Sequence, residues 1–202
     1  NQVAEKGKDI WNKALSSISI KGGNENDKIV FYTSLYRVYE RMINISEEGK
    51  YYSAFDHQIH NDEGIPFYTD DWLWDTYRAA HPLRTIIEPE KESHMVNSYI
   101  RMSEQMEDYW MPTFPEVVGD VRGMNSNHGV ADCYAKGVRG FDLEKAYRAC
   151  KGAITEKTLA PWSAKKKGEL DEFFVQEGYF PALATGEEET VPEVHPFERR
   201  QP

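Results

Sequence analysis

Residues 95–109, MVNSYIRMSEQMEDY, contain the pattern that decides the fold class. Met95, Tyr99, Met102, Met106 and Tyr109 follow one another at steps of four, three, four and three residues. That spacing places all five side chains on one face of an α-helix. The stretch therefore predicts a helix whose apolar face lies in the core of a helical domain.

Similar patterns on both sides of this stretch predict further helices. Upstream, one helix ends at the glycines at positions 22–23, a second begins near Asn26, and a third begins at Asp70 and is closed by Pro89. Downstream, two shorter helices follow, and Asp142 caps the second. The expected apolar faces are, in chain order, Trp11, Ala14, Leu15 and Ile18; Leu35, Val38, Tyr39, Met42 and Ile43; Leu73, Tyr77, Ala80 and Ile87; Val130, Cys133, Tyr134 and Val138; and Leu143, Ala146, Tyr147, Cys150 and Ile154.

Two stretches lack helical spacing. Residues 51–68 consist of short apolar runs broken by Asp, His, Asn and Gly, which predicts a long loop with a small hairpin. Residues 110–127 carry prolines and glycines at positions 112, 115, 119 and 123, which predicts a turn-rich crossing between helices.

The elements together predict a mainly α fold, with about six helices in antiparallel succession and almost no strand. Short turns alternate with long loops, as they would in part of an α/α toroid of the six-hairpin glycosidase type. In such a toroid, the long loops at one end of the barrel build a cleft. A helical bundle or solenoid agrees equally well with the periodicity. All 202 residues are expected to belong to one helical domain.

The charge of the chain argues against a nucleic-acid partner. The net charge is −10 and the pI is about 5.1, and the one basic run, at residues 165–167, is short. No stretch approaches the roughly 18 apolar residues of a membrane span. Residues 1–6 do not resemble a signal peptide, so any targeting segment is expected upstream. Cys133 and Cys150 are too few for a disulfide framework and are predicted to be buried, small apolar side chains.

The densest group of functional side chains lies at residues 70–78, DDWLWDTYR. On a helix starting at Asp70, the side chains of Asp71, Asp75 and Arg78 would share one face. Two interpretations remain open. Asp70 and Asp71 could cap the helix while Asp75 and Arg78 form an ion pair. Alternatively, the segment could form a sugar subsite, in which Trp74 packs on the ring and Asp75 accepts hydrogen bonds from hydroxyls.

Other side chains allow chemistry that the sequence does not decide. A glycosidase needs two carboxyl groups about 5–9.5 Å apart, and any pair among Asp62, Glu63, Asp70, Asp71 and Asp75 could be proposed. Metal binding by His57, His60, Asp62 and Glu63 is disfavoured, because they lie in an apparent loop without a recognisable metal motif. His128, at a loop-to-helix junction, could line a cleft or be structural. No metal ligands are therefore predicted.

Several strings of this sequence, in order, resemble the catalytic domain of glycoside hydrolase family 92. The resemblance covers roughly residues 10 to 155. It is carried by FYTSLY at 31–36, GIPFY at 64–68, LWDTYRAAHPL at 73–83, ADCYAKG at 131–137, GFD at 140–142 and EKAY at 144–147.

The resemblance implies an α/α toroid joined to an N-terminal β-sandwich, calcium dependence, and exo-acting removal of α-linked mannose with inversion of configuration. It implies that Trp74 and Asp75 hold the terminal mannose, with Arg78 beside them. The expected partner is a mannose-containing glycan, and the expected location is secreted, periplasmic or on a bacterial cell surface. Another sugar specificity, or a non-catalytic carbohydrate-binding or interaction module, is the alternative.

The sequence departs from the family in one respect. The family's general acid lies in a Glu-Gly-Asn-Ala-Trp-Gln-Tyr type motif and its base in a Gly-Asn/Asp-x-Asp-x-Gly type motif, and neither string occurs here. The resemblance therefore places the acid, the base, most calcium ligands and the β-sandwich in other parts of the same polypeptide. A partial toroid is also expected to expose apolar helix faces.

Overall fold

The described part of the chain is mainly helical, as predicted. The computed structural model describes residues 2–71, 73–106, 126–157 and 166–179. The helices there are α1 (Gln2–Leu15), α2 (Glu25–Val38), α3 (Leu73–Thr76), α4 (Ala80–Ile87), α5 (Pro89–Gln105), α6 (Ser126–Ala135), α7 (Leu143–Thr155) and α8 (Glu169–Glu177), with short strands β1 (Ile43–Asn44), β2 (Lys50–Tyr52), β3 (Ile59–Asn61) and β4 (Tyr68–Thr69). Tyr109, most of the interval at 110–127 and the chain beyond residue 179 lie outside the described residues.

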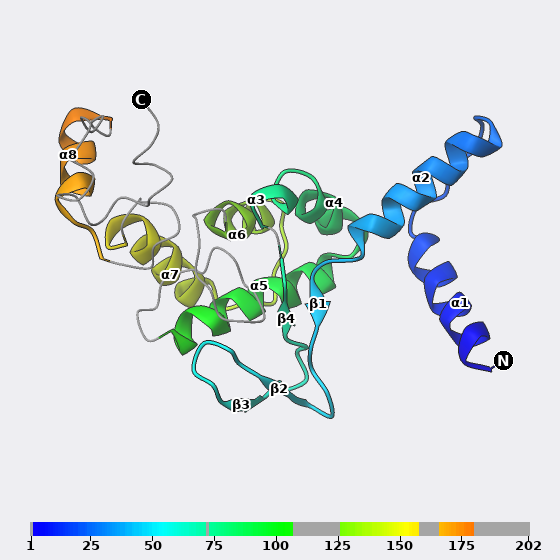
Figure 1. Cartoon of the computed structure of the whole chain (residues 1–202), viewed down its shortest axis with the longest axis horizontal. Coiled ribbons are helices and arrows are strands. Elements are labelled where there is room, and N and C mark those ends of the chain that lie inside the picture. The colour runs from blue at the N-terminus through cyan, green and yellow to red at the C-terminus, as the bar shows by residue number, and fades with distance from the viewer. Residues whose placement is uncertain (1, 72, 107–125, 158–165, 180–202) are drawn as a thin grey trace, which may run out of the picture.

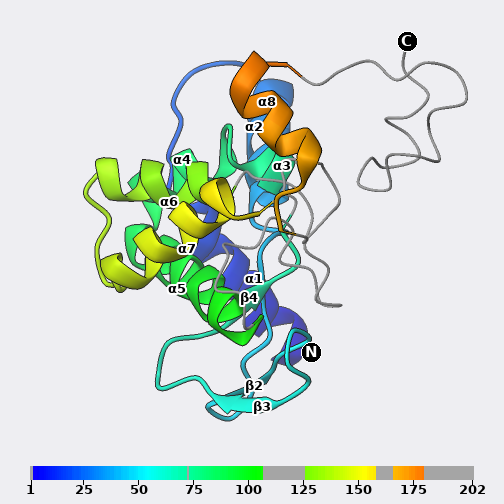
Figure 2. The same ribbon diagram turned by 90° about the vertical axis from the view of Figure 1, so that its left-hand side faces the viewer.

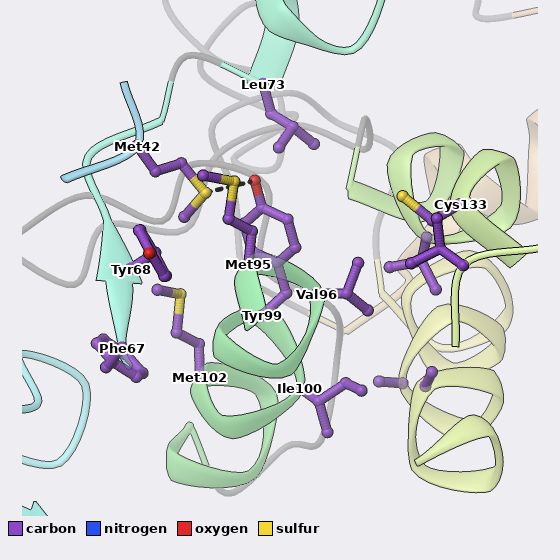
Figure 3. Close-up of a cluster of buried hydrophobic side chains, with 14 of the residues drawn as sticks. Met42, Phe67, Tyr68, Leu73, Met95, Val96, Tyr99, Ile100, Met102 and Cys133 are labelled. Carbon is purple, nitrogen blue, oxygen red and sulfur yellow. Dashed lines mark hydrogen bonds between the residues drawn. The ribbon is translucent and has the colours of Figure 1, made fainter. Parts of the chain in front are cut away.

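Helix α5 is the centre of the core. Met95 and Met102 are fully buried and Tyr99 is 1% exposed, which confirms the predicted apolar face. The helix packs against α4, α6, α7 and strand β4. Figure 3 shows Tyr99 pointing to Met42 on one side, while Val96 points toward Cys133 of α6 on the other. The prediction for the cysteines holds in part, because both are free and Cys133 is buried, but Cys150 is only partly buried.

Helix α7 confirms its predicted cap and, at Ala146, part of its predicted face. The Asp142 carboxylate accepts a hydrogen bond from the backbone N–H of Lys145 at 3.0 Å. The buried face consists of Ala146, Ala149, Gly152 and Ala153. Leu143, Tyr147 and Ile154 were expected inside but are exposed to 44%, 66% and 52%. The buried face of α7, which packs against α5 and α6, therefore carries small side chains, and the large apolar ones lie outside.

Several helices end earlier than their apolar patterns predict. Helix α1 stops at Leu15, before Ile18 and the glycines at 22–23, and α6 stops at Ala135, before Val138. Helix α2 stops at Val38, and a turn leads into β1, so Met42 reaches the core from the bend before β1 while Ile43 is 44% exposed. The helix expected from Asp70 is interrupted by a turn at residues 77–79, which separates α3 from α4. Pro89 was predicted to close that segment, and in the structure it also starts α5, where its missing N–H removes no helical hydrogen bond.

The segment at 51–68 contains the predicted hairpin. Strands β2 and β3 pair antiparallel, with Tyr51 opposite His60, and β1 pairs with β4 at the base. The Tyr51 ring stacks on Phe67 with centroids 4.0 Å apart. Figure 2 shows this hairpin as a projection beyond one end of α5.

Helices α1 and α2 extend away from the rest of the described structure (Figure 1). No residue of α1 is buried, and only Leu35 of α2 is. Exposed apolar side chains include Val3, Ile10, Ile29 and Val30, each at least 58% exposed. The expected exposure of apolar helix faces is therefore confirmed. The described helices do not by themselves outline a toroid.

Gly140, in the turn between α6 and α7, shows how much a close contact with α5 and a left-handed backbone contribute to stability. Its φ is +96°, and an added Cβ would lie 2.8 Å from Ser93 Oγ of α5. We expect Gly140→Ala to lower the free energy of unfolding by about 1–3 kcal/mol, because it adds backbone strain to a steric clash. Urea unfolding measures this. Gly137→Ala separates the two causes, since Gly137 has φ +86° and open space around it. Equal losses in both variants would show that the close approach to Ser93 costs nothing.

Candidate functional site

The predicted sugar-binding residues lie on α3, a helix of four residues. Its first residue, Leu73, is fully buried against the core, whereas the Asp75 side chain is exposed. Among the described residues, no side chain pairs with the Asp75 carboxylate. Trp74 lies between them on the helix, and its side chain is outside the described set. Helix α3 is therefore anchored in the core by Leu73 and exposes the Asp75 carboxylate to solvent.

The expectation that Asp71, Asp75 and Arg78 share one face is wrong. Asp71 precedes α3 and is 1% exposed, while Asp75 and Arg78 are exposed. The helical spacing fails because the helix contains only residues 73–76. The alternative Asp75–Arg78 ion pair is also absent from the described structure. Arg78 donates its backbone N–H to the Asp75 carbonyl at 3.4 Å and its side-chain Nε–H to the Tyr77 hydroxyl at 3.1 Å.

The two aspartates before α3 bond to other side chains. Asp70 forms a 2.6 Å ion pair with Arg41 at the surface. Asp71 is the centre of a buried network. Its Oδ1 accepts from the Thr76 hydroxyl at 2.8 Å, and its Oδ2 accepts from the Tyr99 hydroxyl at 2.6 Å and from His81 Nε2 at 2.7 Å. Asp71 thus connects α3, α4 and α5.

The network continues from His81 to Glu92 on α5 and to Cys133 on α6. His81 Nδ1 lies 2.7 Å from Glu92 Oε1, and the Cys133 thiol of α6 donates to the same oxygen at 3.4 Å. His81 is 2% exposed and Glu92 1%. Because both ring nitrogens face carboxylate oxygens, which only accept hydrogen bonds, both must carry protons and the ring is an imidazolium.

The pKa values agree with this assignment. Burial alone would lower the pKa of His81, but the charge of Glu92 and the hydrogen bonds with Asp71 and Glu92 outweigh it and raise the pKa to about 9. Burial alone would raise the pKa of Asp71, but bonds from His81, Tyr99 and Thr76 hold it below its usual 3.8. Burial and the Asp71 charge raise the pKa of Tyr99, so its hydroxyl stays protonated and donates.

Arg84 brings a second positive charge into the same core. It is 1% exposed, and its Nη2 donates to the Val38 carbonyl at 2.5 Å. The core therefore contains two basic side chains, His81 and Arg84, and two acidic ones, Asp71 and Glu92. Opposite charges and short hydrogen bonds favour the burial of such groups, although Arg84 Nε and Glu92 Oε2 have no hydrogen-bond partner among the described residues.

His81 should make the stability depend on pH. Its pKa of about 9 exceeds the usual 6.5, so its contribution is fully present below pH 6.5 and is lost as the pH rises toward 9. Lys157 has the opposite sign, because burial lowers its pKa from 10.5 to about 8 and its contribution grows only above pH 8. We expect the free energy of unfolding to fall between pH 6.5 and 8 by up to about 1.4 kcal/mol per pH unit.

Urea unfolding at several pH values across that window measures the slope. His60→Gln is the control, because His60 pairs with Asp56 near the surface, at 2.8 Å with side chains 33% and 26% exposed. That variant should keep the slope and His81→Gln should lose it. A slope that persists without His81 would show that another group causes it.

Sequence reasoning missed this network, although one signal was present. Glu92 lies three residues before Met95, so it continues the buried face of α5. A carboxylate on a core face requires a buried partner. The partner, His81, lies on α4, and the sequence contains nothing that pairs the two.

The histidines and carboxylates of the hairpin do not converge. His60 Nε2 bonds to Asp56 at 2.8 Å, His57 Nδ1 bonds to the Tyr52 hydroxyl at 2.9 Å, and Asp62 accepts from the Gly64 backbone at 2.9 Å. Glu63 is exposed. In the described ranges, no group of three or more His, Cys, Asp or Glu could hold a metal ion. The side chain of His128 lies outside the described residues.

A groove of about 700 Å³ lies between the hairpin, α5 and the start of α7. Its polar side chains bond mainly to one another. Lys145 pairs with Glu104 at 2.8 Å, and Gln105 donates to the Tyr51 hydroxyl at 2.8 Å. Nothing in this groove points to a particular ligand.

Comparisons with known proteins agree on one family. Residues 1–194 match the Glycosyl hydrolase family 92 catalytic domain. The structure resembles the family GH92 inverting mannosidase BT2199 from Bacteroides thetaiotaomicron VPI-5482, with a TM-score of 0.74 and 29% identity over 89% of this chain. It also resembles the family GH92 α-mannosidase BT3965 from Bacteroides thetaiotaomicron, with a TM-score of 0.74 and 27% identity over 90% of this chain. No relative is found among the curated proteins.

The chain spans only part of these solved structures. It covers 24% of the length of each of the two mannosidases. BT3965 has also been solved in complex with mannoimidazole, and this chain covers 22% of that structure.

Proposed function

The chain belongs to the glycosyl hydrolase family 92 catalytic domain, and from that membership we propose that the complete protein removes terminal α-linked mannose from glycans with inversion of configuration. This chain supplies part of the substrate pocket. The observation that carries the proposal is the family match over residues 1–194. The similar structures that are named inverting mannosidase and α-mannosidase support it.

The catalytic pair belongs to other parts of the same polypeptide. In an inverting glycosidase, one carboxylic acid protonates the leaving oxygen and a second carboxylate activates water on the opposite face of the sugar. The acid and base motifs expected from the family are not among these 202 residues. Of the carboxylates proposed from the sequence, Asp70 pairs with Arg41, and Asp71 is buried in the network.

The substrate-binding residues are Trp74, Asp75 and Arg78. The exposed Asp75 carboxylate can accept hydrogen bonds from sugar hydroxyls, and the ring of Trp74 can pack on a sugar face. Arg78 contributes less, because its guanidinium lies 5.5 Å from the Tyr77 ring and bonds to that hydroxyl.

The helices belong to an α/α toroid that other segments of the polypeptide complete, next to an N-terminal β-sandwich. The exposed apolar side chains of α1, α2 and α7 support this arrangement, because unpaired apolar faces are usually covered by a neighbour. Calcium, which helps to bind and distort the sugar in the complete enzyme, is held mostly by ligands outside this chain.

The protein acts outside the cytoplasm, as a secreted, periplasmic or cell-surface bacterial enzyme. Its substrate is a mannose-containing glycan, and nucleic acid is not a partner because the chain carries a net charge of −10. Among the described helices, none is long and apolar enough to cross a membrane.

The test is to express the whole reading frame and measure mannose release from α-linked mannobiose, with calcium and with a chelator. We expect release with calcium and a strong reduction with chelator. Absence of release from every α-mannoside would overturn the proposal. Release from glucosides or galactosides instead would indicate another sugar specificity. Sugar binding without turnover would indicate a non-catalytic module. The intact mass of the expressed protein shows whether the polypeptide is longer than these 202 residues, which have a mass of 23.4 kDa.

A further inference from the structure

Helix α3 cannot hold its conformation by itself. It contains four residues, fewer than an isolated helix needs in water. Among the described side chains, two contacts connect it to the core. Leu73, at its first position, is fully buried, and the Thr76 hydroxyl, at its last position, donates to Asp71 Oδ1 at 2.8 Å. Asp75 lies between these two contacts.

The acceptor at the second contact is itself immobilised. Asp71 Oδ2 receives the Tyr99 hydroxyl from α5 at 2.6 Å and His81 from α4 at 2.7 Å. His81 is in turn held by Glu92 of α5 at 2.7 Å. All four side chains of this buried network, Asp71, His81, Glu92 and Tyr99, are at most 2% exposed. A continuous path of short bonds therefore connects the core helix α5 to the end of α3.

We propose that Asp71, held by His81 and Tyr99, is a positioning residue that fixes α3 through Thr76 and thereby orients Asp75 in the mannose subsite. The inference rests on the proposed function, because it assumes that Asp75 binds the sugar. Binding groups contribute to catalysis only when their geometry is held closely, and a small displacement of such a group costs rate.

The experiment uses Thr76, because variants of Asp71 itself are expected to be strongly destabilised. In the complete enzyme, Thr76→Val removes the hydroxyl and keeps the shape of the side chain, whereas Thr76→Ser keeps the hydroxyl. With α-linked mannobiose as substrate, we expect Thr76→Val to lower kcat/KM about tenfold and Thr76→Ser to stay within about twofold of the wild type. Thr85→Val is the matched control, because the Thr85 hydroxyl bonds only locally, to the Pro82 carbonyl at 2.7 Å.

A double-mutant cycle separates positioning from other roles. If Thr76 acts through Asp75, Thr76→Val should change kcat/KM by less than about twofold in an Asp75→Ala background. An undiminished effect in that background would overturn the inference, since Thr76 would then act independently of Asp75. A second outcome would also overturn it. If Thr76→Val loses thermal stability but its kcat/KM, measured well below the unfolding temperature, is unchanged, Thr76 is a purely structural residue.

Failure of the inference is distinguishable from failure of the proposed function. A large loss in Asp75→Ala with no loss in Thr76→Val contradicts the positioning role alone. A mannosidase in which Asp75→Ala has no effect contradicts the proposed subsite, and the positioning role falls with it.

Discussion

Asp71→Asn is expected to lower the free energy of unfolding by about 3–5 kcal/mol, the usual cost of removing one member of a buried ion pair. The variant keeps the size of the side chain, so it opens no cavity. It removes the charge that faces the His81 imidazolium at 2.7 Å. It also places an amide NH₂ group among three donors, the Thr76 and Tyr99 hydroxyls and His81 Nε2, where a carboxylate accepted from all of them.

Asp56→Asn is the control for this prediction. Asp56 lies 2.8 Å from His60 and also accepts a backbone hydrogen bond, from Gln58 at 3.0 Å, but its side chain is 26% exposed. Water can replace the lost interaction there, so we expect a change below about 1 kcal/mol. Urea unfolding of both variants measures the difference. Similar losses would mean that burial of Asp71 adds nothing to the strength of its contacts.

Asp75→Ala is expected to lower kcat/KM of the complete enzyme about 100-fold or more, with little change in stability. A site that hydrogen-bonds a substrate hydroxyl loses much affinity when one partner is removed, because the other is left unpaired. The stability should hardly change, since the Asp75 side chain is exposed and pairs with no described side chain. Steady-state kinetics with α-linked mannobiose and a thermal unfolding curve measure the two quantities.

Glu25→Ala is the matched control for Asp75. Glu25 is an exposed acid that pairs with Lys28 at 2.7 Å on α2, which extends away from α3 (Figure 1). That variant should keep full activity. A loss of less than about threefold in Asp75→Ala would place the sugar elsewhere in the protein.

Local sequence patterns determined much of the fold. The steps from Met95 to Tyr99 and Met102 predicted the buried face of α5, and Asp142 predicted the start of α7. The interrupted pattern at 51–68 predicted the hairpin. The ordered strings between residues 31 and 147 predicted the family that the comparison confirms. All of these depend on residues close in sequence or on identity at fixed positions.

On α7, the tertiary structure decided which side chains are buried. There, periodicity favoured Leu143 and Tyr147 for the core together with Ala146, but the core cluster contains Ala146 and Ala149 and neither of the large residues. The local sequence does not determine which face of a helix its neighbours in the fold will cover.

The same holds for the two aspartates near α3. The sequence places Asp71 and Asp75 four positions apart and gives them equal standing as candidates for a catalytic pair of carboxylates. In the structure Asp71 is buried and Asp75 is exposed. The difference arises from Tyr99 and His81, which are 28 and 10 residues from Asp71 in the chain. A buried carboxylate is stable only where distant groups supply its hydrogen bonds and opposite charge, and only the folded chain brings those groups together.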